Sequence, residues 1–247
     1  MTVQFVTHTL SVCLVKEVTT CAIVTTGIRA MEGRVFVTDF QSKDDTLLIS
    51  RGMAIFHRGV NPETPGKQLI VIPHHIAVGL DYDCKEGRII WSDISGHSIR
   101  SASLNGTDHK SFYANELSSP EGIAVDWSSR NVYYADSLND EIGVASLDGK
   151  YQKALVTEGL VNPRALALDM HNSTRVHSVG IYGNGYTSFP ISLGGSGKVY
   201  GILSVPKHCS APHTGCSVEN GGCSYLCLPG QKGVRCECPS NVAVKGC

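Results

Sequence analysis

The sequence predicts an all-β chain in which stacked β-propeller blades precede a small disulfide-rich module. Three observations carry this prediction: a repeat of fixed period, tight-turn signals inside each copy, and a dense group of cysteines near the C-terminus. A period of about 40–50 residues with four short strands is typical of a propeller blade. Because one blade cannot bury both of its faces, blades must stack on one another.

The repeat has a period of 43 residues. Gly79–Asp83 corresponds to Gly122–Asp126 and then to Ala165–Asp169. Aligned without gaps, residues 79–121 and 122–164 share 11 of 43 residues. The shared positions are mainly turn glycines, aspartates, a proline and apolar strand residues, so both copies are expected to form the same strands and turns.

Each copy is expected to form four strands. In the first full copy these cover residues 79–83, 88–92, 97–104 and 109–114. Asn105–Gly106, between the last two of them, is a strong signal for a tight hairpin turn.

A worn copy precedes the two clear ones, and a broken copy follows them. Leu48–Ile49–Ser50 lies 43 residues before Trp91–Ser92–Asp93, and residues 67–72 are expected to be an outer strand. Residues 171–197 lack the pattern and are rich in glycine, so irregular structure is expected there. An apolar strand is expected again at 198–205.

The composition excludes several classes of protein. The 247 residues carry a net charge of −1 without a basic run, which argues against nucleic-acid and membrane-surface binding. No apolar stretch reaches the length of about 18 residues that a membrane span needs. Six of the ten cysteines lie in the last 32 residues, which indicates secretion into an oxidising, extracellular compartment. Residues 1–26 nevertheless lack the positive and then apolar pattern of a signal peptide.

Residues 1–45 match nothing in the repeat and stay unassigned. Within them, residues 5–26 are rich in Val, Ile and Thr, which favours strands. Cys13 and Cys21 are expected to be buried or stray thiols rather than a functional pair, because no His or Cys lies at metal-ligand spacing. His74–His75 also lacks a third ligand, so no metal site is predicted.

No catalytic signature is present, since the chain lacks both His-Glu-x-x-His and Gly-x-Ser-x-Gly. Asp81 and Asp83 fall on one face of a predicted strand and could form a carboxylate pair. The next copy of the repeat, however, has Ala124 in place of Asp81. We therefore expect no enzyme activity and no cofactor.

Residues 46–206 are predicted to be the blade domain, and residues 209–247 a disulfide-rich domain. The clustered cysteines follow the spacing Cys216-x6-Cys223-x3-Cys227-x8-Cys236-x-Cys238-x8-Cys247. So short a segment cannot enclose a hydrophobic core, so disulfides must stabilise it, and spacing alone does not choose among the possible pairings. Outside the cluster, Cys84 and Cys209 are predicted to pair.

Two sequons for N-glycosylation fall on predicted turns. They are Asn105–Gly106–Thr107 and Asn172–Ser173–Thr174. At Asn105 the alternative is an unmodified turn residue, because an Asn–Gly turn is tight.

The C-terminal cysteine cluster, with Asn220–Leu228 inside it, resembles an epidermal-growth-factor-like (EGF-like) module of the kind found beside LDL-receptor-type propellers. The resemblance implies the disulfides Cys216–Cys227, Cys223–Cys236 and Cys238–Cys247. Calcium-binding members have acidic and amide residues just before the first cysteine. Ser210–Gly215 offers none, so a calcium site is not expected.

The 43-residue repeat resembles the Tyr-Trp-Thr-Asp propeller family through Trp91–Ser92–Asp93 and Tyr134–Ala135–Asp136, although both lack the Thr. The resemblance implies that Asp93 and Asp136 brace neighbouring blades. Six blades of this period, as the family has, would need about 258 residues. The sequence therefore predicts a partial six-bladed propeller of two to three four-stranded blades, missing its middle blades through splicing or an imperfect gene model. Exposed strand edges and apolar blade faces are expected.

Within this family, several segments resemble the nidogens, which are linkers of the basement membrane, and they keep the same order. They are Arg51–His57, Val78–Cys84, Ser119–Gly122, Val161–Ala165 and Tyr200–Ile202. The resemblance implies an extracellular-matrix connector with laminin as its partner, and collagen and perlecan as possible further partners. The alternative is a fragment of an LDL-receptor-family endocytic receptor ectodomain, for which cysteine-rich ligand repeats or a membrane span are expected and not found in this sequence.

Glu121 and Arg164 are the candidate partner-binding residues. They follow the repeat proline at equivalent positions, and the resemblance implies that such positions rim a central channel where nidogens hold an extended laminin loop. Opposite charges suit capture of a polar peptide through charge-assisted hydrogen bonds. The alternative is that both are solvated loop charges or pair with one another.

Overall fold

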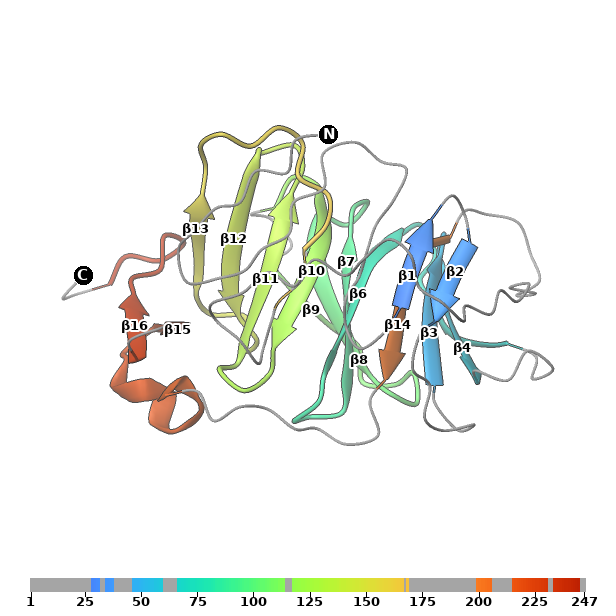
Figure 1. Cartoon of the computed structure of the whole chain (residues 1–247), viewed down its shortest axis with the longest axis horizontal. Coiled ribbons are helices and arrows are strands. Elements are labelled where there is room, and N and C mark those ends of the chain that lie inside the picture. The colour runs from blue at the N-terminus through green and yellow to red at the C-terminus, as the bar shows by residue number, and fades with distance from the viewer. Residues whose placement is uncertain are drawn as a thin grey trace.

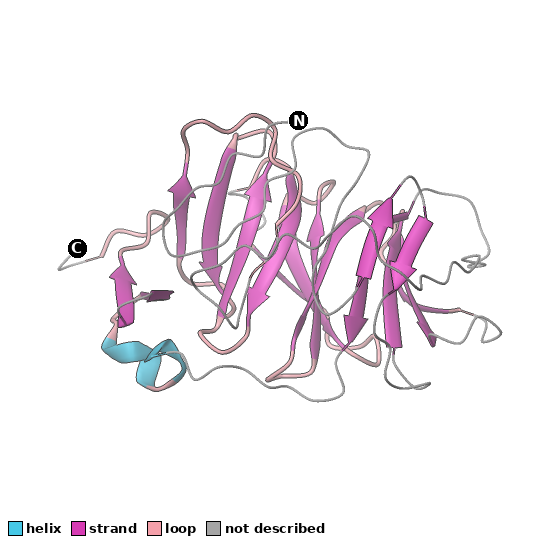
Figure 2. Cartoon of the chain, in the orientation of Figure 1, coloured by secondary structure: helices cyan, strands magenta, loops and turns pink. Residues whose placement is uncertain are grey.

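The structure, a computed structural model, describes residues 28–31, 34–37, 46–59, 66–113, 117–166, 168, 199–205, 215–230 and 233–244. In these ranges the chain consists of antiparallel strands, with two short 3-10 helices near the C-terminus at Gly215–Ser217 and Glu219–Gly222 (Figure 2). The predicted all-β class is confirmed. Cys13, Cys21, Asn172 and residues 171–197 lie outside the described residues.

Three four-stranded antiparallel sheets have the arrangement of propeller blades (Figure 1). The first blade contains β3 (Thr46–Arg51), β4 (Ala54–Gly59), β5 (Lys67–Val71) and β14 (Val199–Val205). The second blade contains β6 (Ala77–Asp83), β7 (Arg88–Asp93), β8 (Ser98–Ser103) and β9 (Lys110–Phe112). The third blade contains β10 (Pro120–Asp126), β11 (Asn131–Asp136), β12 (Glu141–Ser146) and β13 (Gln152–Val156). The predicted four-stranded blades are therefore confirmed.

Two hairpins accompany the blades. β1 (Ile28–Met31) pairs with β2 (Arg34–Val37) in the N-terminal segment, and β15 (Leu226–Gly230) pairs with β16 (Gly233–Glu237) in the C-terminal module. The strand-forming stretch expected at residues 5–26 lies outside the described residues.

The closing strand β14 belongs to the first blade, although it follows the other blades in the chain. It pairs with β3, with Leu203 opposite Leu48. β6 packs between β14 and β10, so the three inner strands lie side by side (Figure 1). The apolar strand expected at 198–205 is thus confirmed, and it completes a sheet that would otherwise have three strands.

Alternate side chains of each strand fill the layers between the blades. The layer between the first and second blades includes Leu48, Ile55, Leu80, Ile89, Trp91 and Leu203. The layer between the second and third blades includes Ile90, Ile99, Ile123, Val125, Val132 and Tyr134. Neighbouring residues such as Ile90 and Trp91 thus face opposite layers, which explains why every position of β7 is buried.

The worn first copy has a different register from the one that its alignment predicts. Ser50 Oγ donates to the carbonyl of Val78 (3.0 Å), as Ser92 Oγ donates to the carbonyl of Glu121 (2.8 Å). Val78 and Glu121 are 43 residues apart, so Ser50 is the counterpart of Ser92. The predicted match of Ser50 with Asp93 is therefore wrong by one residue. A single deletion in a worn copy is enough to cause this slip.

The C-terminal module packs against the third blade. Leu226 and Leu228 of β15 belong to the same buried cluster as Tyr133 and Ile142 of the blade. The expectation that blade faces are left exposed is therefore wrong for the third blade, because its outer apolar face is covered.

Candidate functional site

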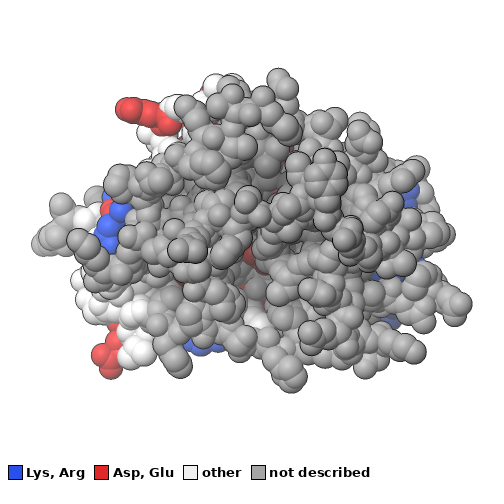
Figure 3. Space-filling model, viewed as in Figure 1, with Lys and Arg blue, Asp and Glu red and all other residues white. Residues whose placement is uncertain are grey.

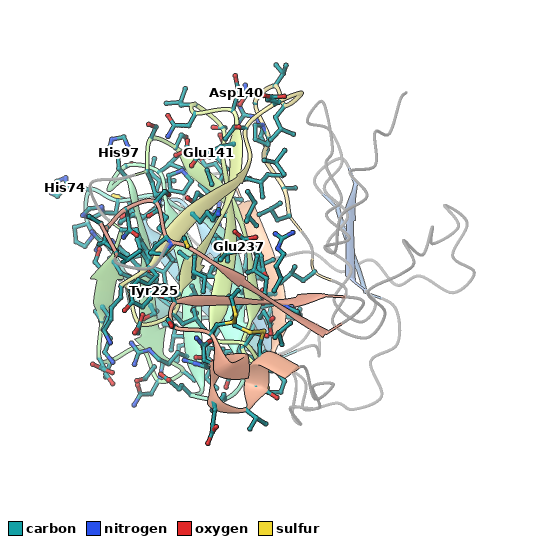
Figure 4. All side chains as sticks on the ribbon, turned by 90° about the vertical axis from the view of Figure 1, so that its left-hand side faces the viewer. His74, His97, Asp140, Glu141, Tyr225 and Glu237 are labelled. Carbon is teal, nitrogen blue, oxygen red and sulfur yellow. A yellow bond between two sulfur atoms is a disulfide. The ribbon has the colours of Figure 1, made fainter. Side chains whose placement is uncertain are left out.

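The candidate site lies on the upper rim, defined as the end of the blades where β6 and β10 begin and β7 and β11 end (Figure 1). Figure 4 shows His97, Asp140 and Glu141 near this end, and Tyr225 and Glu237 of the module further down. Burial, and then the charge of Asp136, raise the pKa of Glu141 above its usual range.

Glu121 and Arg164 lie on the upper rim and contact each other. Nη1 of Arg164 lies 2.7 Å from Oε1 and 2.6 Å from Oε2 of Glu121. Ser137 Oγ donates a further hydrogen bond of 2.8 Å to Glu121. The side chain of Glu121 is only 14% exposed, whereas that of Arg164 is 42% exposed. Of the alternatives left open by the sequence, the two side chains pair with one another, and Glu121 holds an arginine that faces solvent.

Two apolar side chains of the upper rim are also exposed. Leu138, in the turn after β11, is 73% exposed, and Val161 is 65% exposed. The amide of Asn162 donates to Asp140 Oδ1 (2.6 Å), which ties the loop of Val161 to the turn of Leu138. Sequence reasoning missed both residues because isolated apolar residues in turns carry no motif.

The backbone around Glu121 is fixed by a close approach of the inner strands. Ser92 Oγ accepts from the amide of Gly79 (2.8 Å) and donates to the carbonyl of Glu121. A Cβ atom on Gly79 would lie 2.5 Å from that carbonyl oxygen. Only glycine therefore permits this packing of β6 against β10.

Asp93 organises the upper rim of the second blade. The carboxylate is fully buried, and its Oδ2 lies 2.7 Å from His75 Nδ1 and 2.8 Å from Arg100 Nε. Oδ1 accepts from the amides of Ile76 (3.3 Å) and Gly96 (2.9 Å). Asp93 thus joins the segment that enters the blade to the β7–β8 turn.

Asp136 has the equivalent place in the third blade and is also fully buried. It accepts from the amides of Ser118 (2.6 Å) and Ser119 (2.9 Å), which lie in the segment leading from the second blade into β10. It also accepts from the amides of Leu138 (3.2 Å) and Asn139 (3.3 Å) in the β11–β12 turn. The carboxylate therefore connects the blade-to-blade segment with the turn that carries exposed Leu138.

The C-terminal module contains the disulfides Cys216–Cys227 and Cys223–Cys236, the same pairs that the resemblance implies. Cys84 and Cys238 are disulfide-bonded as well. Cys209 and Cys247, their expected partners, lie outside the described residues. Within the described ranges, no group of three or more His, Cys, Asp or Glu side chains could hold a metal ion.

A groove of about 730 Å³ lies at the opposite end of the second and third blades, against the module. Its arginines are engaged by carboxylates: Arg88 by Asp108, and Arg130 by Asp83 and Glu86. Asp83 is buried and bonded to Arg130 of the third blade, and Asp81 Oδ2 accepts from the amide of Val125 in the same blade. The Asp81–Asp83 pair considered in the sequence therefore serves contacts between blades. Arg164 of the upper rim is also paired with a carboxylate, but its side chain is 42% exposed, against 30% for Arg130 and 9% for Arg88, so the upper rim is the better candidate for contact with a partner.

Two segments of the chain are repeats of a known kind. Residues 87–127 and 130–170 match the family model described as low-density lipoprotein receptor repeat class B. The second and third blades thus have the class B repeat, as the Trp91–Asp93 and Tyr134–Asp136 segments predict. None of the helices in the described ranges has the length and apolar character that crossing a bilayer requires.

Relatives of the chain include nidogens and receptor proteins. Nidogen of Drosophila melanogaster is 41% identical over 91 residues, which cover 36% of this chain and 6% of the relative. Low-density lipoprotein receptor-related protein 5 of Mus musculus is 37% identical over 93 residues, with 36% and 6% covered. One chain in the crystal structure of a nidogen/laminin complex is 35% identical in sequence to this chain, with a TM-score of 0.48. The match covers 51% of this chain and 49% of the chain in the complex. The expected resemblance to nidogens is confirmed, and the chain spans a small part of these curated relatives.

Proposed function

We propose that the chain is a non-catalytic, secreted connector of the basement membrane that binds a laminin-type protein through the upper rim. The observation that carries the proposal is the exposed side chain of Arg164, held by the less exposed Glu121 on a rim that also presents exposed Leu138 and Val161. The sequence similarity to nidogen supports a matrix partner. Collagen and perlecan are further candidate partners through the same similarity.

The chemistry of the rim suits a peptide segment that presents a carboxylate. A guanidinium is planar and can donate to both carboxylate oxygens at once. Within the described residues, Arg164 donates through Nη1 alone, so Nη2 and Nε can serve a ligand. Leu138 and Val161 are exposed on the same rim and can supply apolar contact, and a combination of apolar and charged contacts is typical of interface anchors.

Arg164→Ala is expected to weaken binding to laminin by at least about tenfold. The change removes a charge-assisted hydrogen bond, for which a loss of about 1.5–3 kcal/mol is usual. Biolayer interferometry on immobilised laminin measures the effect. Glu121→Gln should have a smaller effect, because Glu121 positions the arginine and is itself largely covered.

Lys150→Ala is the matched control for this experiment. Lys150 is also an exposed cation with a carboxylate partner, Asp148, but it lies at the opposite end of the third blade. The Lys150→Ala chain should bind laminin with the same affinity as the unsubstituted chain. Equal affinities of Arg164→Ala, Glu121→Gln and Lys150→Ala would reject the upper rim as the site.

A second candidate function is that of a piece of an endocytic receptor ectodomain. It is favoured by the similarity to low-density lipoprotein receptor-related protein 5. Absence of laminin binding by the unsubstituted chain, together with capture of a soluble ligand of such receptors, would favour this function over the connector.

We also propose that Asn105 carries an N-linked glycan. Its side chain is exposed, and Oδ1 accepts from the amide (3.1 Å) and Oγ1 (2.7 Å) of Thr107. These bonds leave Nδ2, the atom that carries a glycan, accessible at the turn. The test uses the chain secreted from animal cells and measures the mass that it loses on glycosidase treatment. This loss should be smaller by one glycan in Thr107→Ala and unchanged in Thr107→Ser. An identical mass loss in both variants would contradict this assignment.

A further inference from the structure

The third blade has an apolar face directed away from the second blade. It is formed by buried side chains on alternate positions of its strands, namely Ala124, Tyr133, Ala135, Ile142 and Val144. In a stack of blades, such a face is covered by the next blade. The described residues contain no fourth four-stranded sheet. Another part of the chain must therefore exclude water from this face.

The strand β15 of the C-terminal module covers part of it, and Leu166, which follows β13, packs in the same cluster. Leu226 and Leu228 are 1% and 2% exposed and pack in the cluster of the blade face. Two residues apart in a strand, they point to the same side. Cys227 between them points to the other side, where it bonds to Cys216 within the module. The sequence Leu-Cys-Leu thus gives β15 one side for the blade and one for the module.

The module also covers the outer edge of the third blade. Gln152, the first residue of edge strand β13, donates its amide to Asn241 Oδ1 (2.9 Å) and accepts at its carbonyl from the amide of Ser240 (2.7 Å). Asn241 Nδ2 in turn donates to the carbonyl of Lys150 (3.1 Å). An open strand edge invites pairing with another chain, so these bonds protect the blade.

Polar contacts fix the position of the module on the blade. The Asn131 side chain donates to the carbonyl of Cys227 (2.7 Å), and Lys153 Nζ lies 2.5 Å from Glu237 Oε2. Basic and acidic side chains adjoin at the left-hand margin of Figure 3, on the side of the molecule where β13 and β16 lie. In Figure 4 the module strands lie in front of the third blade, with Glu237 beside it. The contact between module and blade therefore has an apolar centre and a margin of hydrogen bonds and an ion pair, as stable interfaces do.

We propose that the EGF-like module is the cap of the blade stack: β15 takes the place of a neighbouring blade, and Ser240–Asn241 protect the edge of β13. The blades then depend on the module for their stability, rather than carrying it as an independent appendage. This inference concerns the lower and outer surfaces of the third blade and is independent of binding at the upper rim.

Tryptophan fluorescence can test the cap in the full chain. Both tryptophans, Trp91 and Trp127, belong to the blades, so their signal reports blade unfolding and not module unfolding. Leu228→Ala should lower the thermal midpoint of this signal by about 5 °C or more, as expected for a buried leucine at an essential contact. Val218→Ala, at a module residue that is 66% exposed, should leave the midpoint unchanged.

Asn241→Ala is a milder second variant that leaves the apolar contact intact. It should accelerate hydrogen exchange at the amide of Gln152 and lower the tryptophan midpoint by about 2 °C. An unchanged tryptophan midpoint in both Leu228→Ala and Asn241→Ala, with Gln152 exchange also unchanged, would overturn the cap. That result would make the module an appendage that unfolds without the blades.

Discussion

Asp136→Ala is expected to lower the free energy of unfolding by about 4 kcal/mol, because it removes the acceptor of several buried donors. The amides of Ser118 and Ser119 bond to this carboxylate at 2.6 and 2.9 Å. No water can replace an acceptor that is fully buried without a rearrangement of the segment between the second and third blades. The loss should therefore affect the whole stack rather than one turn.

Urea denaturation followed by tryptophan fluorescence measures this loss. Asp136→Asn retains one carbonyl oxygen and should lose about half as much stability. Glu158→Ala, at an exposed residue after β13, is the control and should change stability by less than about 0.5 kcal/mol. A loss below about 1 kcal/mol in Asp136→Ala would show that the carboxylate is dispensable to the stack.

The repeat singles out Asp136 and its counterpart Asp93, and the resemblance to Tyr-Trp-Thr-Asp propellers, rather than the repeat alone, implies their role as braces. Both aspartates recur at a spacing of 43 residues at the end of the second strand of a blade, where turn and connecting amides need an acceptor. Local signals also predict the strands. Turn residues flank β7 and β11, and the apolar and aromatic residues within these two strands favour strand structure. Local and periodic features of this kind do not depend on distant parts of the chain.

Other features depend on distant contacts, and the sequence does not predict them. The docking of Leu226 and Leu228 on the third blade requires a segment far along the chain to meet that face. In the sequence these leucines are simply neighbours of a cysteine in a short module. The predicted register of Ser50 is wrong for a different reason. A gap-free alignment cannot detect a deletion in a worn copy of the repeat. At the site, Arg164 follows from its repeat position, whereas exposed Leu138 does not.

Asp81 lies between the inner strands of the second and third blades, and its titration should govern part of the pH dependence of stability. Oδ2 accepts from the amide of Val125 in β10 (2.6 Å), and Oδ1 accepts from the amide of Tyr82 (2.8 Å). Burial raises the pKa of Asp81 from 3.8 to about 6, against the opposing effect of these two hydrogen bonds. Ala124 occupies the equivalent position in the third blade, so the effect can be assigned to one residue.

The sign of this effect follows from proton binding. Between pH 4 and pH 6 the folded chain keeps the proton of Asp81, whereas the unfolded chain has lost it, so stability falls as the pH rises. Above pH 6 both states are ionised, and the full loss of about 3 kcal/mol is reached. Asp108 acts in the opposite direction, because its hydrogen bond to Arg88 lowers its pKa, but it is a surface group with little weight.

Asp81→Asn should therefore remove a downward slope in the stability profile. Asparagine loses one of the two backbone hydrogen bonds, so the Asp81→Asn chain differs in stability at every pH. The informative quantity is therefore how the difference in stability between the two chains changes with pH. Free energies of unfolding from urea denaturation at pH 4, 5, 6 and 7 should show the unsubstituted chain losing about 2 kcal/mol relative to Asp81→Asn, since a small part of the full loss falls below pH 4. If the two chains instead lose stability in parallel as the pH rises, the pKa of Asp81 is not raised and water reaches its carboxylate. Because that carboxylate bonds β6 to β10, the contact between these inner strands would then be looser than the 2.6 Å bond to Val125 indicates.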